Sequence, residues 1–278
     1  MNGTRKIVKP ELTIALPEFS KAVLLHEYKD EHGAVSVYEN DQYRWIQSGA
    51  GNIQSAMRKT DASNPVLPYF PALLSALLFL PAPQRILIIG LGGGELIRFF
   101  KHCLPDTELF AIEKSRAMIH AFNCYFQQNT LPIDVIADDI CTYTSHRDQR
   151  PYDMVFLDVY GENSLPACLY EKHFYYKLSG MLSDQGILSI NLIVRDEAEA
   201  IELLKSIRKA FHKMTLCLSV GKHMNIVVLA FNQPPKIKTI QQLNKNAIQL
   251  NASSSINFNE LIDNIFASNP NNGTHLSF

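Results

Sequence analysis

The chain has 278 residues with a formal net charge of −1 at pH 7, and 46% of them are hydrophobic. This length suits one large domain and a smaller one, and the apolar content supports a substantial core. The near-neutral charge argues against a nucleic acid or an acidic membrane surface as the main partner. The longest apolar stretch, residues 72–80, is shorter than the about 20 residues that span a bilayer, and the polar residues 1–9 lack an apolar signal core.

The cysteines and histidines indicate neither a disulfide framework nor a metal site. Five cysteines are scattered along the chain without a C-x-x-C pair, and the nine histidines show no H-E-x-x-H spacing. Scattered cysteines of odd number fit free thiols in a reducing compartment. Together with the polar start, they predict a cytoplasmic protein that holds no metal ion.

The first 60 residues are expected to form a small N-terminal β-hairpin domain. Extended runs lie at residues 21–26, 34–39 and 43–47, with turn residues at 29–33. Asn40 and Asp41 suit a tight turn and predict a hairpin within an antiparallel sheet. Proline residues then interrupt the chain before a predicted apolar helix at residues 69–80.

The central part of the chain alternates between strand and helix patterns. Apolar runs predict strands at residues 86–89, 108–112, 133–136, 153–157 and 186–192. Helical patterns lie at residues 95–103, 115–128, 170–178 and 196–211, with Ser115 as a predicted N-cap. Alternation of this kind predicts a parallel, doubly wound sheet.

Two further predicted strands, residues 215–220 and 225–231, are joined by a short turn at Gly221 and Lys222. Parallel neighbours need a crossover of about a dozen residues or more, so this pair is expected to be antiparallel. A doubly wound α/β sheet that ends in an antiparallel hairpin is the class I methyltransferase variant of the Rossmann-like fold. We expect residues 61–232 to form such a domain.

The last part of the chain, residues 233–278, is expected to be a partly disordered C-terminal extension. Pro234 and Pro235 mark its start, and Asn, Gln and Ser are frequent in it. Short helices are predicted near residues 240–249 and 259–267. The polar composition predicts disorder after Asn269.

A glycine-rich turn follows the first central strand, in the run ILIIGLGGGELIRFF at residues 86–100. Strand, glycine turn and helix in this order build nucleotide-sized sites at the carboxyl edge of a sheet. The dinucleotide pattern G-x-G-x-x-G fails because its sixth position is Glu95, and no phosphate-binding lysine follows. Alternate glycines at Gly90, Gly92 and Gly94 suit a nucleoside without a pyrophosphate, such as an S-adenosyl compound. A tight structural turn is the alternative.

Glu113 ends the second central strand, 23 positions after Gly90. About 20 residues separate the glycine turn from the ribose-binding acid in nucleotide sites, so this spacing favours ribose binding. A carboxylate there can accept hydrogen bonds from both ribose hydroxyls. The alternative is a solvated acid at the helix entry, paired with Lys114 or Arg116.

Two later strand ends also carry acids. Asp138 and Asp139 follow the third strand and could bind an adenine amino group or cap the following segment, and we favour Asp139 for adenine. Asp158 ends the fourth strand near the topological switch point, where it could accept a proton from an amine nucleophile. The polar loop after it carries Tyr160 and Glu162, and functional residues concentrate in such loops. Loop capping is the alternative for Asp158.

These residues occur in the same order as in a known family. The matching segments are residues 54–57, Pro68 and Tyr69, residues 88–94, Glu113, Asp138 and Asp139, residues 157–160, and Leu165 and Pro166. The chain resembles the spermidine synthase family of polyamine aminopropyltransferases, and within it the divergent bacterial spermidine synthase-like branch. The small β-domain ahead of a Rossmann-like domain is also the layout of that family.

The resemblance implies a transferase that uses decarboxylated S-adenosylmethionine as co-substrate and a small amine, such as a polyamine, as acceptor. By resemblance, Gln54 would contact the nucleoside, Glu113 the ribose and Asp139 the adenine. Asp158 would be the catalytic acid–base residue, and Tyr69 would lie on the acceptor side. Members of the family are commonly dimers, so a homodimer is also an expectation.

The chain departs from the family on the acceptor side. Gly93 and Gly161 stand where the family carries acids, and Phe70 stands where it carries histidine. Glu95 and Glu162, close to these positions, are the candidate replacements for the missing acids.

Two alternatives to aminopropyl transfer stay open. One is a methyltransferase that uses intact S-adenosylmethionine, although Glu95 would repel the carboxylate of that donor. The other is a nucleoside-binding protein without turnover. The absent acceptor-side acids favour this last possibility, and Asp158 argues against it.

Overall fold

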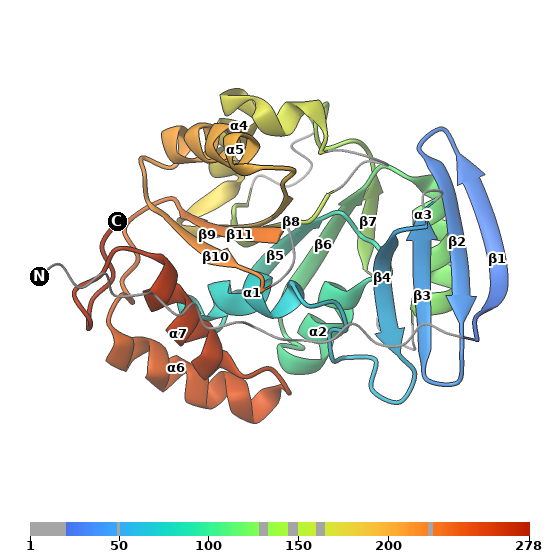
Figure 1. The fold of residues 1–278 in the computed structure, drawn as a ribbon, viewed down its shortest axis with the longest axis horizontal. Helices are drawn as coiled ribbons and strands as arrows, with labels where there is room; N and C mark the ends of the chain where they lie inside the picture. The colour runs from blue at the N-terminus through green and yellow to red at the C-terminus, as the bar shows by residue number, and fades with distance from the viewer. Residues whose placement is uncertain (1–20, 49–50, 128–132, 144–149, 160–164, 222–224) are drawn as a thin grey trace, which may run out of the picture.

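The computed structural model describes residues 21–48, 51–127, 133–143, 150–159, 165–221 and 225–278. They build two sheets, a small one at the N-terminal side and a large central one with helices on both faces (Figure 1). Within the described residues, no helix is long and apolar enough to cross a membrane.

The small sheet is antiparallel, and its four strands pair in chain order. They are β1 (Val23–Asp30), β2 (Gly33–Glu39), β3 (Tyr43–Ser48) and β4 (Ile53–Arg58). The predicted hairpin between β2 and β3 is confirmed, because Asn40 Oδ1 accepts hydrogen bonds from the backbone of Gln42 and Tyr43. The sequence patterns missed β4, which pairs with β3 across a register shift.

The central sheet has seven strands in the order β10-β11-β9-β8-β5-β6-β7. They are β5 (Arg85–Ile89), β6 (Glu108–Glu113), β7 (Asp134–Ala137), β8 (Tyr152–Leu157), β9 (Leu182–Ile193), β10 (Thr215–Ser219) and β11 (Asn225–Phe231). Strand β11 runs antiparallel to both of its neighbours, and the other pairs are parallel. The predicted class I methyltransferase arrangement with a terminal antiparallel hairpin is confirmed. Lys222, in the turn of that hairpin, lies outside the described residues.

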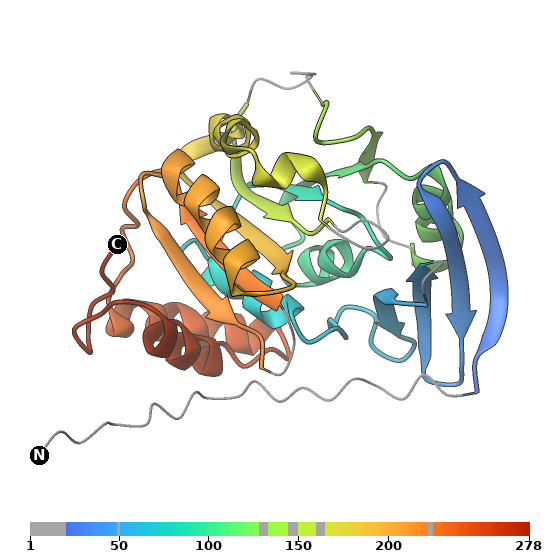
Figure 2. The same ribbon diagram turned by 45° about the horizontal axis from the view of Figure 1, so that its top comes forward.

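Helices cover both faces of this sheet, as a doubly wound fold requires (Figures 1 and 2). The α-helices are α1 (Phe70–Leu74), α2 (Glu95–Cys103), α3 (Arg116–Ala121), α4 (Lys172–Met181), α5 (Glu197–Ala210), α6 (Ile240–Ser253) and α7 (Phe258–Ser268). One apolar cluster joins α4 and α5 to the sheet, and a second joins α1, α2, α6 and α7 to the opposite face and to the small sheet.

Two predicted helices are shorter than their sequence patterns. The helix expected at residues 69–80 consists of α1 followed by a 3₁₀ turn at Ser75–Leu78, and Pro71 at its start is compatible with a first helical turn. The helix expected at residues 115–128 is α3 followed by a π-helical turn at Phe122–Phe126. The N-cap is confirmed, because Ser115 Oγ accepts a hydrogen bond from Met118 N.

One contact between the two sheets fixes the entrance to α3. Asp30 Oδ2, at the end of β1, accepts hydrogen bonds from Ser115 Oγ at 2.7 Å and from Ala117 N at 2.9 Å. Burial alone would raise the pKa of Asp30, but these hydrogen bonds outweigh it and hold the pKa below its ordinary value. The small sheet is therefore attached to the central domain beside the carboxyl end of β6.

The C-terminal segment is ordered, so the disorder predicted after Asn269 is wrong. Thr239 and Gln242 form a capping box at the start of α6, and Thr239 also pairs with His275. Leu276 is only 4% exposed and pairs with Asn271. The asparagine-rich composition suggested a solvated tail, but its side chains close turns, as when Asn272 Oδ1 accepts a hydrogen bond from His275 N.

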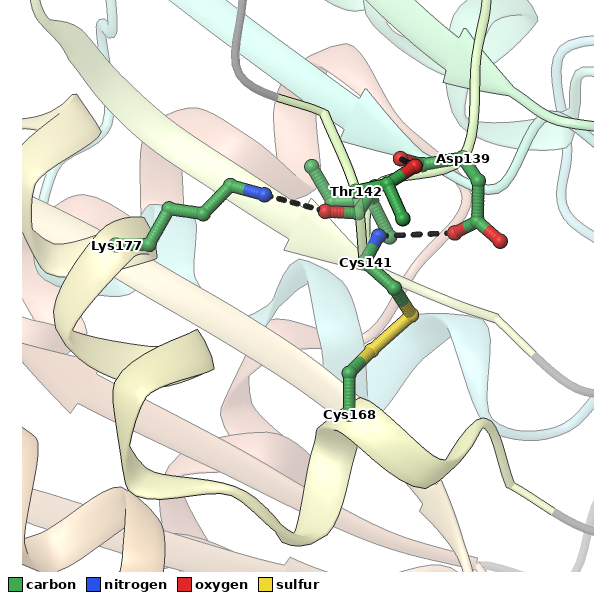
Figure 3. The surroundings of a disulfide bond; sticks show 6 residues. Asp139, Cys141, Thr142, Cys168 and Lys177 are labelled. Carbon is green, nitrogen blue, oxygen red and sulfur yellow. Dashed lines mark hydrogen bonds between the residues drawn. A yellow bond between two sulfur atoms is a disulfide. The ribbon is translucent and has the colours of Figure 1, made fainter.

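The prediction that all cysteines are free thiols is also wrong. Cys141 and Cys168 form a disulfide with a Cα–Cα separation of 5.7 Å, while Cys103, Cys124 and Cys217 are free (Figure 3). The two partners are 27 positions apart in the sequence. One follows β7 and the other lies in a 3₁₀ turn, Ala167–Tyr170, so only the folding of the sheet brings them together.

Candidate active site

A cavity of about 600 Å³ opens at the carboxyl edge of the central sheet, between this sheet and the small one. Residues that directly follow β5, β6, β7 and β8 line it, because parallel strands bring their carboxyl ends to one edge. The small sheet contributes a wall that includes Gln54 and Ser55. The volume lies in the range typical of small-molecule sites.

The structure brings most of the predicted site residues together around this cavity. Those that line it are Gln54, Tyr69, Gly90, Gly92, Glu95, Glu113, Asp138, Asp139 and Asp158. Gly94 does not line the cavity, and a Cβ on this residue would come within 2.3 Å of the Phe122 ring. Tyr160 and Glu162 lie outside the described residues, and so does Gly161.

The cavity lies at the topological switch point of the sheet. Strand β5 continues to β6 on one side and pairs with β8 on the other. Asp158 N donates a hydrogen bond of 2.9 Å to Ile89 O, and a Cβ on Gly90 would lie 2.0 Å from Asp158 O. Because the two strand ends approach so closely, only glycine fits at Gly90, which has a φ of +95°.

Gly93 is crowded for a different reason. A Cβ at this position would lie 2.8 Å from Ser55 Oγ and 3.1 Å from the Phe126 ring. Strand β4 and the π-helical turn therefore occupy the space into which a side chain would extend. An acid at this position would need both neighbours to move.

Glu113 is held by backbone donors. Its Oε2 accepts a hydrogen bond from Leu91 N at 3.0 Å, and its Oε1 accepts one from Ser115 N at 2.9 Å. Burial raises the pKa of Glu113 above its ordinary value, while these bonds oppose the rise. A carboxylate oxygen can accept more than one hydrogen bond, and Glu113 lines the cavity. The hydrogen-bond partners of Glu113 are backbone groups of the glycine turn and of the start of α3, so this residue is more than a surface acid paired with a neighbouring cation.

Asp138 and Asp139 shape the turn after β7. Asp138 Oδ1 accepts a hydrogen bond from Asp139 N at 2.8 Å, and Asp139 Oδ1 accepts one from Cys141 N at 2.8 Å. Figure 3 shows Asp139 beside the Cys141–Cys168 disulfide, near Lys177, whose Nζ donates to Ile140 O. Asp138 and Asp139 therefore both hold the backbone of this turn and line the cavity. The role of Asp139 in binding adenine stays a prediction.

Asp158 is the centre of a hydrogen-bond network in the cavity wall. Its Oδ2 accepts a hydrogen bond of 2.9 Å from the Tyr69 hydroxyl, and its Oδ1 accepts one of 2.9 Å from Asn191 Nδ2. Asn191 Oδ1 in turn accepts a hydrogen bond of 2.8 Å from Asn225 Nδ2. Burial raises the pKa of Asp158, and the donors Asn191 and Tyr69 act against the rise.

Glu95 is the most deeply buried acid of the cavity, with 3% of its surface exposed. Its Oε1 accepts a hydrogen bond of 2.9 Å from Ala56 N, and its Oε2 finds no partner among the described residues. Burial raises its pKa to about 8; Arg98 opposes this rise and the charge of Asp158 adds to it. Oε2 is therefore a buried acceptor in the wall of the cavity.

Sequence reasoning missed Asn191 and Asn225, which also line the cavity. One signal was present, because Ser189 and Asn191 are the polar residues of the otherwise apolar run ILSINLI in β9. Polar residues at alternate positions of a buried strand share one face, which suggests a common polar environment. Nothing in the sequence linked Asn225 to Asn191.

The sheet order and the acid-lined cavity at its switch point define a Rossmann-like α/β enzyme of the class I methyltransferase type. The family model of the spermine/spermidine synthase domain matches residues 74–228, more than half of the chain. The chain therefore belongs to the spermine/spermidine synthase family, whose members are transferases.

A relative supports this family assignment, and two solved structures share the fold. A polyamine aminopropyltransferase of Neisseria meningitidis serogroup A is 31% identical over 249 residues, covering 87% of this chain and 92% of the relative. A probable spermidine synthase from Corynebacterium glutamicum has a TM-score of 0.67 at 15% identity, covering 87% of this chain and 93% of that one. Human methyltransferase-like protein 13 in complex with SAH has a TM-score of 0.59 at 21% identity, covering 67% and 92%.

Proposed function

We propose that the protein transfers an aminopropyl group from decarboxylated S-adenosylmethionine to a small amine, at an acceptor site that differs from the usual one of its family. The observation that carries the proposal is the position of Asp158, which lines an acid-rich cavity at the switch point of the sheet. Of the residues that the structure describes, five acids and two basic side chains, His32 and Lys114, line this cavity. Such a charge balance suits a sulfonium donor and an amine acceptor.

The reaction is a displacement at the carbon next to the sulfonium. An ammonium acceptor first gives a proton to the Asp158 carboxylate, because only the free amine has an electron pair for attack. The new C–N bond forms as the C–S bond breaks, and the electron pair of the broken bond neutralises the sulfonium. Methylthioadenosine leaves, and the Asp158 proton returns to solvent.

The nucleoside half of the donor would occupy the β5–β7 side of the cavity. Glu113, already fixed by two backbone donors, would accept hydrogen bonds from the ribose hydroxyls, as charge-assisted bonds of this kind orient a nucleoside well. Asp138 or Asp139 would accept from the adenine amino group, and Gln54 would contact the nucleoside from the small sheet. The S-adenosyl ligand of the human structural neighbour supports this class of donor.

Glu95 favours the decarboxylated donor over intact S-adenosylmethionine. Its unpaired Oε2 lies at the start of α2, directly after the glycine turn. A donor ammonium could displace the proton of Glu95 and pair with the carboxylate, whereas the carboxylate of intact S-adenosylmethionine could form no such pair and would be repelled by the ionised form. Because the space beside Gly93 is crowded by Ser55 and Phe126, we assign to Glu95 the role of the acid that the family carries at position 93. The acceptor roles of Tyr160 and Glu162 stay predictions.

Product analysis tests the proposal. The protein is incubated with decarboxylated S-adenosylmethionine and a panel of diamines and polyamines, and aminopropylated product and methylthioadenosine are measured by mass spectrometry. Asp158→Asn should abolish both products and keep donor affinity in calorimetry, whereas Asp134→Asn, an exposed acid of β7, should change neither. An active Asp158→Asn variant would remove Asp158 from the mechanism.

Methyl transfer is the second candidate, favoured by the structural similarity to the human methyltransferase-like protein. The same incubation with S-adenosylmethionine distinguishes it, because methyl transfer releases S-adenosylhomocysteine instead of methylthioadenosine. Binding without turnover is the third. Tight methylthioadenosine binding with no product from any donor and amine would leave that function in place of the proposed one.

A further inference from the structure

Two amide side chains, one from β11 and one from β9, form a hydrogen-bonded chain that ends at Asp158. Asn225 Nδ2 donates to Asn191 Oδ1 at 2.8 Å, and Asn191 Nδ2 donates to Asp158 Oδ1 at 2.9 Å. Asn191 lies in β9 and is 4% exposed, while Asn225 is the first residue of β11. These strands are adjacent and antiparallel, with Asn191 opposite Val227 and Asn225 opposite Ile193. A regular ladder therefore holds both amides.

The chemistry of these groups fixes the direction of the chain. A carboxylate has no hydrogen to donate, so the amide nitrogen of Asn191 must point to Asp158. Its carbonyl oxygen then points away and needs a donor, which Asn225 supplies. If the Asn191 amide were reversed, two acceptor oxygens would face each other at Asp158 and two NH₂ groups would face each other at Asn225.

The two oxygens of Asp158 are consequently not equivalent. Oδ1 faces an amide that can only donate, and a proton on this oxygen would oppose the Asn191 NH₂ group. Oδ2 faces the Tyr69 hydroxyl, which can rotate and either donate or accept. The proton taken from a substrate therefore has one favourable place, Oδ2.

We infer that Asn191 and Asn225 are positioning residues that keep Oδ1 of Asp158 unprotonated and direct the proton transfer to Oδ2. The identity of the proton donor, an amine acceptor, rests on the proposed function. Without the Asn191 donor, the enclosed carboxylate would lose one of its two hydrogen bonds and would be protonated more readily. Asn225 acts one step further away, by keeping the Asn191 amide in the donating orientation.

Among the described residues, few other ionisable groups act on Asp158. The phenol of Tyr69 contacts it from the α1 side, and the carboxyl of Glu95, with Arg98 behind it, faces it from α2. Strands β9 and β11 contribute the two neutral amides, and β5 contributes the Gly90 backbone. A substitution at Asn191 should therefore change the pKa of Asp158 directly.

The test compares Asn191→Leu, Asn225→Leu and the double variant with the unmodified protein. Two quantities are measured: the carboxyl titration of Asp158 by NMR in the ligand-free protein, and the pH profile of kcat for aminopropyl transfer. Asn191→Leu should raise the pKa of Asp158 by about one unit and shift the acidic limb of the kcat profile upward by the same amount. On that limb kcat should fall about tenfold, because one unit is a factor of ten in the protonation equilibrium. The KM for the donor should change less than about twofold, since the amide does not contact the nucleoside half.

Asn225→Leu should produce a smaller shift in the same direction. In the Asn191→Leu background it should add nothing to the pKa shift, because its effect passes through Asn191. Asn264→Leu is the matched control: Asn264 is an amide of α7 that is 3% exposed and donates to Ser219 O away from the cavity. It should lower stability and leave the Asp158 titration unchanged.

The outcomes separate this inference from the proposed function. If wild-type protein makes no aminopropylated product, the proposed function fails, and the NMR titration still decides whether Asn191 controls Asp158. If Asn191→Leu leaves the titration unshifted, the positioning role is wrong whatever the reaction. Should Asn191→Leu fail to fold, Asn225→Leu decides by the same titration, and an unshifted pKa there overturns the inference.

Discussion

The hydroxyl of Tyr69 donates a hydrogen bond of 2.9 Å to Oδ2 of Asp158, across 89 positions of the chain. Tyr69 is the N-cap residue of α1, and Asp158 follows β8. The Tyr69 ring stacks on Phe70 with centroids 4.5 Å apart, which limits its movement. The phenol and the proposed base therefore act as one unit at the cavity wall.

Tyr69→Phe should lower kcat about tenfold to a hundredfold and leave donor affinity unchanged. The variant removes one of the two donors to Asp158, so the pKa of Asp158 should rise and the loss of kcat should be largest on the acidic side of the pH profile. Steady-state kinetics as a function of pH measure this effect. Tyr176→Phe, at an exposed phenol of α4, is the control. Equal kcat values for wild type and Tyr69→Phe would contradict the prediction.

Glu95→Gln should stabilise the ligand-free protein at alkaline pH and weaken the binding of cationic ligands. The native pKa of Glu95 is about 8, above its ordinary value of 4.5, so between these pH values the native state holds a proton that the unfolded state has lost. Stability therefore falls as pH rises through this window, by up to about 1.4 kcal/mol per pH unit, and the amide variant lacks this fall.

Urea unfolding at pH 5 and pH 8 measures the difference between Glu95→Gln and wild type. The difference should be small at pH 5 and should favour the variant at pH 8. The exposed Glu202→Gln of α5 should show no such dependence. Binding of a cation should also release a proton from Glu95 at pH 7, which calorimetry in buffers of different ionisation enthalpy detects. A pH-independent stability difference would refute the prediction.

Glu113→Gln should weaken methylthioadenosine binding about tenfold to a hundredfold, because charge-assisted hydrogen bonds contribute about 1.5–3 kcal/mol. The amide keeps the shape of the side chain and loses the charge that faces the cavity. Calorimetry measures the affinity. Glu108→Gln changes an acid at the other end of the same strand, beside Arg85, and should leave the affinity unchanged. An equal loss in both variants would mean that Glu113 has no special role.

Gly93→Ala and Gly180→Ala should change stability in opposite directions. A Cβ at Gly93 would press on Ser55 and Phe126, and overpacking of this kind costs about 1–3 kcal/mol. Gly180 lies in α4 with nothing within 4 Å of its Cβ position, so alanine there should stabilise by roughly 0.5–1 kcal/mol. Denaturant unfolding measures both. A tolerated Gly93→Ala would reopen this position to an acid of the family type.

Removal of the Cys141–Cys168 disulfide should lower stability by about 2–4 kcal/mol, the usual effect of a cross-link that closes a loop. It should also weaken methylthioadenosine binding, because Cys141 N holds the carboxylate of Asp139. Cys141→Ser is compared with Cys124→Ser, which changes an exposed free thiol. A dithiol reductant should reproduce the effect in wild type and have none on Cys141→Ser. Wild-type stability that is insensitive to reductant would contradict the prediction.

Much of the cavity could be predicted because its acids follow consecutive strands. Parallel strands place Gly90, Glu113 and Asp158 at one edge of the sheet, so local patterns carried long-range information. Local patterns did not predict the Cys141–Cys168 disulfide, because the spacing of these cysteines matches no known motif. They also predicted a disordered tail, because the turns closed by Asn272 and the burial of Leu276 cannot be read from a polar composition.

The sequence by itself determined the alternation of strands and helices, the glycine turn and the acids at the strand ends, since periodicity and turn chemistry are local properties. Only the tertiary structure decided what surrounds these groups. It buried Glu95, filled the space beside Gly93 with Phe126, and connected Asp158 to Asn191. Burial, crowding and hydrogen-bond direction depend on contacts between distant segments, and these contacts set the pKa values and the free space on which the proposed chemistry depends.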